Sequence, residues 1–125
     1  MIDHFGINCA DLDRSAAFYD AVLATLGHRR LMDFGVAIGY GTEQPCFWIS
    51  TFDGVDANRE VHVAFSAPSA QAVRSWYDAA IAAGGESLHE PRMWPEYHEH
   101  YFGAFVRDPE GNNVEAVCHT AGPGD

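Results

Sequence analysis

Residues 101–116 read YFGAFVRDPEGNNVEA, and the organisation of the whole chain can be worked out from this stretch. Two apolar runs flank a polar turn rich in Asp, Pro, Gly and Asn, a pattern that predicts a strand, a tight turn and a second strand. Glu115 lies inside the second apolar run, Val114–Cys118. Because burying a lone carboxylate costs several kcal/mol or more, Glu115 is expected to be solvated, paired or bound to a cation.

The composition indicates a folded, soluble protein. Hydrophobic residues make up 47% of the 125 residues, which is enough for one compact core. No apolar run approaches the roughly 20 residues of a membrane span, and the first residues lack the pattern of a signal peptide. We therefore expect a cytoplasmic protein with no membrane partner. The net charge of −11 disfavours nucleic acid, whose binding needs Lys and Arg to neutralise phosphates.

The first half of the chain predicts one helix among four strands. Residues 2–9 alternate apolar and polar side chains, which is typical of a half-buried strand with His4 on its polar face. Asp11 or Asp13 can cap a following helix, and Gly27 can end it. Three short strands are then expected over residues 28–34, 36–40 and 45–51.

The second half repeats this pattern at an offset of 58 residues. Residues 60–66 form another alternating strand, in which His62 lies 58 positions after His4. The segments Phe18–Ala21 and Trp76–Ala79 match at the same offset. Agreement over a strand and a helix indicates an internal repeat.

The remainder of the second half follows the same order with a longer connection. Pro68-Ser69 opens a helix that is expected to stop at Gly84-Gly85, where Gly85 falls on Gly27 of the first half. Residues 87–100 contain two prolines and predict a loop that begins with some strand. The two strands around the 108–113 turn complete the unit.

The two halves together predict an α+β fold. Each half reads strand–helix–strand–strand–strand, so we expect two βαβββ modules with one helix on the back of each small sheet. The apolar strand faces would pack on the helices, and the opposite faces would form a curved mixed sheet, a cup. The expected boundaries are a single domain over 1–119, with modules at 1–52 and 60–119, and a tail at 120–125.

Three side chains are candidates for a metal site in this cup. His4 and His62 occupy equivalent places on first strands, and Glu115 points to the same kind of face on a last strand. Two imidazoles and one carboxylate form a ligand set suited to a divalent ion of Fe, Mn, Ni or Zn. The alternative for each residue alone is an ordinary exposed histidine or a solvated glutamate, and their joint placement by the repeat favours the metal.

The chain resembles the vicinal oxygen chelate superfamily, which includes glyoxalase I, bleomycin resistance proteins and extradiol dioxygenases. The resemblance rests on the paired modules, on the Ile2-Asp3-His4 motif at the start of the chain and on the Asp108–Glu115 motif near its end. It implies that His4, His62 and Glu115 fall on metal-ligand positions. It also implies a divalent metal that a small, oxygen-rich substrate chelates through neighbouring oxygens.

Departures from family patterns leave the reaction open. Glyoxalase I-type members carry a glutamate on the last strand of the first half, and Trp48 takes that place here. Because indole cannot ligate a metal or act as a base, authentic glyoxalase I chemistry is not expected. His98 matches the histidine of the extradiol signature, but Phe105 stands where that signature has Tyr. Both dioxygenase-like and lyase or isomerase chemistry therefore remain possible.

The loop before residue 102 contains the remaining candidates. His98, His100 and Tyr101 could supply a general acid or base over the cup, although a polar surface loop would have the same composition. The candidate substrate-binding residues are Trp48, Trp94 and Arg92, and ordinary packing is the alternative for the two indoles.

Two further expectations concern the molecule as a whole. The first is a homodimer, since small sheets leave edges and apolar surface that members of this fold usually bury; whether the cup forms within one chain or across two is open. The second is an alternative function. A non-catalytic protein of the bleomycin-resistance type would bind a planar molecule between Trp48, Trp94 and Tyr101.

Overall fold

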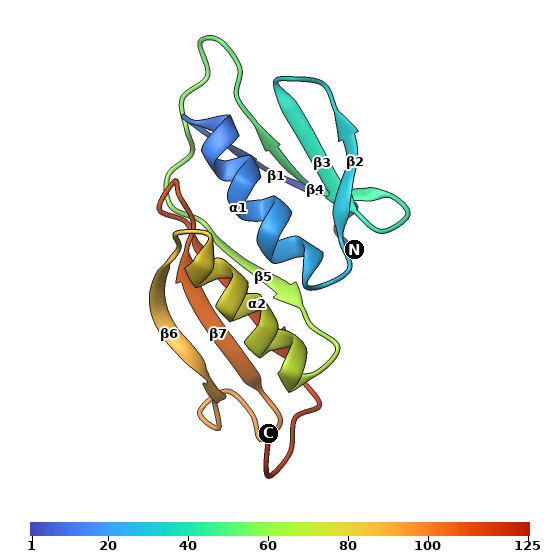
Figure 1. Cartoon of the computed structure of the whole chain (residues 1–125), viewed down its shortest axis with the longest axis vertical. Helices are drawn as coiled ribbons and strands as arrows, with labels where there is room; N and C mark the ends of the chain where they lie inside the picture. The colour runs from blue at the N-terminus through green and yellow to red at the C-terminus, as the bar shows by residue number, and fades with distance from the viewer.

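The computed structural model describes all 125 residues as two four-stranded sheets, each with a helix against it (Figure 1). The elements are β1 (Phe5–Asn8), α1 (Leu12–Ala24), β2 (Arg29–Asp33), β3 (Ala37–Gly41), β4 (Pro45–Ser50), β5 (His62–Ser66), α2 (Ala70–Ala82), β6 (Glu86–Met93), β7 (Phe102–Arg107) and β8 (Asn113–Cys118). We call β1–β4 with α1 module 1, and β5–β8 with α2 module 2.

The two sheets have the same topology. Their strand orders are β1-β4-β3-β2 and β5-β8-β7-β6. In each sheet the first and last strands of the module pair in parallel, and the other pairs are antiparallel. The α+β fold with two βαβββ modules is therefore confirmed.

The helices follow the predicted offset residue for residue. Helix α2 begins and ends 58 positions after α1, and the N-cap residues Asp11 and Ser69 are related by the same offset. The side chain of each accepts a hydrogen bond from the backbone N–H three residues on. The glycines that end the helices depart from the 58-residue offset by one position. Gly27 and Gly84 have the positive φ that favours a helix end, whereas the offset predicted Gly85.

Two predicted boundaries were wrong. The first strand is shorter than residues 2–9, so that His4 precedes β1 instead of lying within it. Residues 86–93, which include Pro91, form strand β6 where a loop with only some strand was expected. The proline is tolerated because β6 is an edge strand whose pairing with β7 has two register shifts.

The two modules share one core. Helices α1 and α2 lie side by side on the same side of the sheets (Figure 1). Phe65 of module 2 packs against two rings of module 1, with centroids 5.2 Å from Phe47 and 6.5 Å from Tyr19. Phe47 and Tyr19 belong to a single cluster of buried residues from both sheets and both helices, which also includes Trp76, and the partly buried Phe65 packs against this cluster. Burial of such large side chains contributes most of the stabilisation.

The turn between β7 and β8 is organised by the Asp108 carboxylate, which is only 5% exposed. One oxygen accepts hydrogen bonds from the backbone N–H groups of Glu110 and Asn112, at 2.9 and 2.8 Å. The other accepts from the Asn112 side chain at 3.0 Å and from the Tyr19 hydroxyl of module 1 at 2.5 Å. The turn is thereby fixed to helix α1.

Two more side chains of this turn bind the other module or the connection to it. The Glu110 carboxylate accepts hydrogen bonds from the backbone N–H groups of Ala10 and Asp11, at 2.8 and 2.9 Å, just before α1. The Asn112 side-chain oxygen accepts from the Val61 backbone and from the Asn58 side chain, both at 3.1 Å. The turn therefore connects β8, the inter-module segment and the start of α1.

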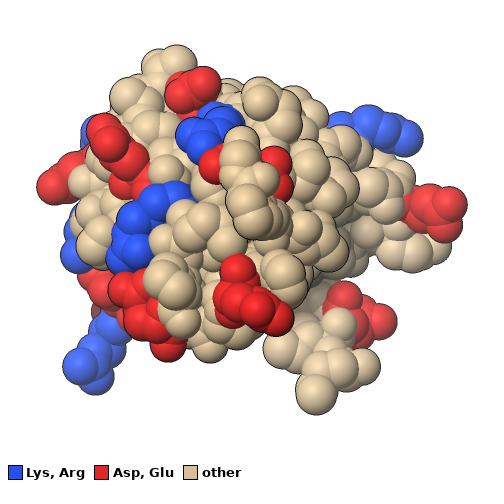
Figure 2. Space-filling view, turned by 90° about the horizontal axis from the view of Figure 1, so that it is seen from below, with Lys and Arg blue, Asp and Glu red and all other residues tan.

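Charged side chains of both signs are interspersed over the surface. In Figure 2, blue basic groups lie among red acidic groups on the face shown. Three of the arginines are paired with carboxylates: Arg30 with Asp20 and Asp33, Arg92 with Glu96, and Arg107 with Glu60. No helix in the structure has the length and apolar character needed to cross a membrane.

We predict that Asp108→Ala lowers the free energy of unfolding by about 3 kcal/mol, because it leaves several buried donors without an acceptor. Tyr19→Phe is the matched control. It removes one donor but leaves Asp108 with its other partners, so the expected loss is about 1 kcal/mol. Chemical denaturation measures both values, and equal losses in the two variants would contradict this account of the turn.

Candidate functional site

Strand register places Glu115 and Trp48 at equivalent positions of the two modules. Glu115 is opposite Ala64 on the β5–β8 pair, and Trp48 is opposite Gly6 on the β1–β4 pair. Ala64 lies 58 positions after Gly6, the offset of the repeat. Alternation along β8 sends Val114 and Ala116 into the core, so that Glu115 projects from the sheet face opposite α2.

Glu115 is 2% exposed and is held between two side chains. One carboxylate oxygen lies 2.8 Å from His62 Nε2. The other accepts a hydrogen bond from the Tyr101 hydroxyl. The expectation that this carboxylate needs a partner is met by His62 and Tyr101, which come from β5 and from the residue just before β7.

The hydrogen bonds of His62 orient its ring. Its Nδ1 lies 3.1 Å from the Asn113 carbonyl oxygen, which can only accept, so Nδ1 carries a hydrogen and donates it. In the neutral ring Nε2 then has a free lone pair, directed at Glu115. Two acceptors facing each other need a proton or a cation between them. The ring also stacks on Phe105, with centroids 5.8 Å apart.

Tyr101 completes this arrangement. Burial, and then its hydrogen bond to the Glu115 carboxylate, raise the pKa of the Tyr101 phenol well above its usual value. The absence of a side chain at Gly103 makes room for the contact, since a Cβ there would lie 3.2 Å from both Glu115 Oε2 and the Tyr101 ring. The phenol therefore remains a proton donor where an exposed tyrosine ionises.

His98 does not contact Glu115. It forms a pair with His119, a residue that was not predicted, and the two nitrogens lie 2.9 Å apart. Both rings pack edge-on against Tyr101, with centroids 5.4 Å and 5.2 Å from it. His98 therefore contacts the Tyr101 ring, whose hydroxyl binds Glu115, but it does not contact Glu115 itself.

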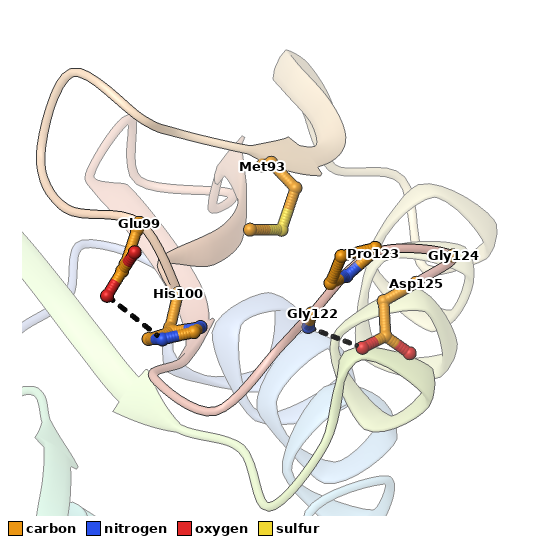
Figure 3. Close-up of a pocket in the computed structure, with 7 residues that line it drawn as sticks. All are labelled: Met93, Glu99, His100, Gly122, Pro123, Gly124 and Asp125. Carbon is orange, nitrogen blue, oxygen red and sulfur yellow. Dashed lines mark hydrogen bonds and ion pairs between the residues drawn. The ribbon is translucent and has the colours of Figure 1, made fainter.

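His100 lies in a different pocket, shown in Figure 3. The pocket measures about 440 Å³ and is formed with Met93 and the segment Gly122–Asp125. His100 Nδ1 lies 2.9 Å from the Ala121 carbonyl oxygen, and Nε2 lies 3.3 Å from Glu99. The structure therefore does not bring His100 together with Tyr101 and Glu115.

Trp94 and Arg92 are engaged within module 2. Trp94 is buried, its N–H donates to the Gly103 carbonyl at 3.0 Å, and its ring stacks on Tyr97. The Arg92 guanidinium lies over the Trp94 ring, 3.3 Å from a centroid, and pairs with Glu96. Trp94 therefore has the packing that was the alternative to substrate binding, whereas the Arg92 side chain is exposed and remains a candidate.

His4 and Trp48 line the same cleft of module 1, which measures about 450 Å³. The side chain of His4 is exposed and pairs with Asp3 at 2.7 Å. The Trp48 indole stacks on Phe34, with 6.1 Å between centroids and 6° between planes. The close approach of Gly39 makes room for this indole, since a Cβ there would be 2.8 Å from its Cζ2 atom.

The three predicted metal ligands do not come together within one chain. His62 and Glu115 form a pair in module 2, while His4 lines the cleft of module 1. No group of three or more His, Cys, Asp or Glu side chains is arranged to hold a metal ion. The three predicted residues of one chain are therefore not placed to bind one metal ion together. The His62–Glu115 pair alone offers one nitrogen ligand and one oxygen ligand.

Sequence reasoning missed His119 and the role of Gly103. His119 follows β8 in a polar tail segment, where nothing in the sequence connects it with His98, 21 residues earlier. Gly103 could have been suspected, because a glycine inside a strand often marks close approach of another group.

Two βαβββ modules with polar side chains on the faces opposite their helices define the fold of the vicinal oxygen chelate superfamily. The chain belongs to this superfamily, in the glyoxalase-like domain family, whose model matches residues 4–117. No curated protein gives a significant match.

Solved structures support the same assignment. A glyoxalase/bleomycin resistance protein from Albidiferax ferrireducens is 29% identical, with a TM-score of 0.84 and coverage of 93% of this chain and 97% of that one. A lactoylglutathione lyase from Agrobacterium tumefaciens is 20% identical, with a TM-score of 0.70 and coverage of 94% and 92%. A glyoxalase I mutant from Zea mays is 22% identical, with a TM-score of 0.71 and coverage of 93% and 46%. The last two show the fold alone.

We predict that Glu115→Gln lowers the pKa of the Tyr101 phenol towards its usual value. The amide removes the negative charge that favours the neutral phenol, while burial continues to raise the pKa. Alkaline titration of the tyrosines by NMR measures the change, and Tyr101→Phe identifies the signal. An unchanged Tyr101 titration in Glu115→Gln would show that the carboxylate does not control this phenol.

Proposed function

We propose that the protein is a small metal-dependent enzyme in which His62 and Glu115 supply two ligands to a divalent ion. The observation that supports this most directly is the orientation of His62. Its Nδ1 donates to a backbone carbonyl and its Nε2 faces a carboxylate oxygen at 2.8 Å. Imidazoles that bind metals commonly have such an outer hydrogen bond, which fixes the tautomer.

A divalent cation would suit this pair electrostatically. Glu115 is buried, and its charge would be balanced by the cation, which would also replace the proton between Nε2 and the carboxylate. When bound, the ion would act as a Lewis acid towards neighbouring oxygens of a small, oxygen-rich substrate. Fe, Mn, Ni and Zn all suit nitrogen and carboxylate ligands.

A second copy of the chain would supply the third ligand, His4. Ile2 and Phe5, which flank His4, are 74% and 39% exposed, and both line an open apolar hollow together with His62. Burial of this surface in a homodimer would stabilise the dimer. It would also allow the exposed His4 of the partner copy to approach the His62–Glu115 pair.

The chain's own residues suggest how protons would be managed. Tyr101 holds one carboxylate oxygen, so the other is left to face His62 and the proposed ion. Its phenol, kept protonated by burial and by Glu115, has one hydrogen, which stays on the carboxylate, so the proposed ion would stabilise a substrate oxygen that develops negative charge. A proton for the substrate would come instead from an exposed imidazole such as His98, in the loop before β7.

Trp48 restricts the reaction. It takes the position in module 1 that matches Glu115 in module 2, so this position offers neither a fourth ligand nor a base. We therefore place the protein with three-ligand members of the superfamily rather than with glyoxalase I. Oxygen consumption with catechols separates ring-cleaving oxygenation from lyase or isomerase chemistry.

We predict stoichiometric divalent-metal binding by the wild type, and its loss in His62→Ala and in His4→Ala. A mixed dimer of one His62→Ala chain and one His4→Ala chain provides a sharper test. If each site takes His4 from one copy and His62 from the other, one of the two sites is intact, and half of the wild-type metal content is expected. Metal analysis after purification with tags that do not bind metal gives the result.

Three outcomes would contradict the metal proposal or its dimeric form. Equal metal contents in wild type and His62→Ala, after Fe, Mn, Ni and Zn have each been offered, would contradict the proposal of a metal-dependent enzyme. A mixed dimer without metal would locate each site within one chain. A monomer mass in gel filtration would exclude the shared site.

A second candidate function is favoured by the module 1 cleft. Trp48 stacks on Phe34 and lines this cleft, as a protein that sequesters a planar molecule would require. The lining includes the Asp3 carboxylate but no arginine, which favours a neutral or cationic molecule over an anion.

For this alternative we predict that a planar cationic dye quenches tryptophan fluorescence in the wild type and in His62→Ala, but not in Trp48→Phe. Trp76 and Trp94 are buried and should contribute little to the change. A fluorescence titration makes the measurement. Quenching that persists in Trp48→Phe would show that the dye binds elsewhere.

A further inference from the structure

The pair formed by His98 and His119 lies outside the proposed ligand set. His98 is in the loop before β7, and His119 follows β8. His98 Nε2 and His119 Nδ1 are 2.9 Å apart, and the two rings are nearly parallel, 26° between planes. Two exposed imidazoles in this arrangement share a hydrogen bond with a defined direction.

The direction follows from a third hydrogen bond. The backbone N–H of His100 donates to His98 Nδ1 at 3.2 Å, so this nitrogen is an acceptor. In the neutral His98 ring the hydrogen is therefore on Nε2, which donates to His119 Nδ1. His119 thus acts as the acceptor that fixes the tautomer and the ring plane of His98.

The two imidazoles pack against the ring that reaches Glu115. His98 and His119 both meet the Tyr101 ring edge-on, and Tyr97 packs on it as well, with centroids 4.9 Å apart. Tyr101 has no side-chain hydrogen bond other than the one to Glu115. Its orientation therefore depends on these neighbouring rings.

We propose that His119 is a positioning residue, which holds His98 and, with it, keeps the Tyr101 hydroxyl on Glu115. The importance of this for catalysis rests on the proposed function, in which Tyr101 orients the Glu115 carboxylate. The positional claim itself concerns only the Tyr101–Glu115 hydrogen bond. It can therefore be tested without metal or substrate.

The experiment is NMR of the protein with ¹³C at the tyrosine Cζ atom, which responds to the hydrogen bond of the phenol. Tyr101→Phe identifies the signal. His119→Ala should shift it towards the position found in Glu115→Ala, in which the phenol has lost its acceptor. His119→Asn should restore it, because the Asn side-chain oxygen can accept in place of Nδ1. His28→Ala, on module 1, is the control and should leave the signal unchanged.

The results separate a positioning role from general destabilisation. An unchanged Tyr101 signal in His119→Ala would overturn the proposal. Equal shifts in His119→Ala and His119→Asn would also overturn it, because the acceptor would then be irrelevant. If His119→Ala does not fold, His119→Phe, which keeps a ring against Tyr101 but has no acceptor for His98, should shift the signal. An unchanged signal in that variant would overturn the proposal.

A metal titration then tests the connection with the proposed function. If His62 and Glu115 bind nickel, His119→Ala should weaken that affinity by about 10-fold, the lower end of the effect of removing outer hydrogen-bond partners of a metal site. Unchanged nickel affinity would show that His119 affects only the Tyr101 hydroxyl, and would overturn an effect of His119 on metal binding. Absence of nickel binding in the wild type would instead count against the proposed function, and the NMR result would stand.

Discussion

The Asp108 carboxylate is the constraint on which the arrangement of the two modules depends. It is buried, and its partners include the Tyr19 hydroxyl of the other module. Burial of a charge is tolerated only when hydrogen bonds replace the lost water, and here four donors do so. The same turn places Glu110 against the start of α1, so one short segment positions strand β8 of module 2 relative to the helix of module 1.

This constraint has consequences for the site, because Glu115 follows the turn by only a few residues. Once β8 is in register with β5, Glu115 is opposite Ala64 and close to His62. The same register in module 1 places Trp48 opposite Gly6. The repeat thus produces two unlike faces, one with a buried carboxylate and one with an indole over an open cleft. In the proposed enzyme these faces would be combined between two copies of the chain.

Secondary-structure elements were predicted more accurately from the sequence than contacts between side chains. The helices, their N-caps and most strands could be predicted, since alternation, capping residues and glycine stops are local signals. The β6 strand was wrongly predicted as mostly loop, because Pro91 has no local sign that it lies at a sheet edge. The Glu115–His62 contact followed from the repeat, whereas His119 depends on where the chain turns after β8.

The sequence by itself determined the fold class, the repeat and the need of Glu115 for a partner, because these follow from periodicity and from the cost of burying a charge. Only the tertiary structure decided which partners are present. His62 and Tyr101 meet the carboxylate, while His4 points into a separate cleft with Trp48. The physical reason is that a repeat specifies equivalent positions within each module, but the packing between modules, set by Tyr19 and Asp108, decides which of these positions face one another.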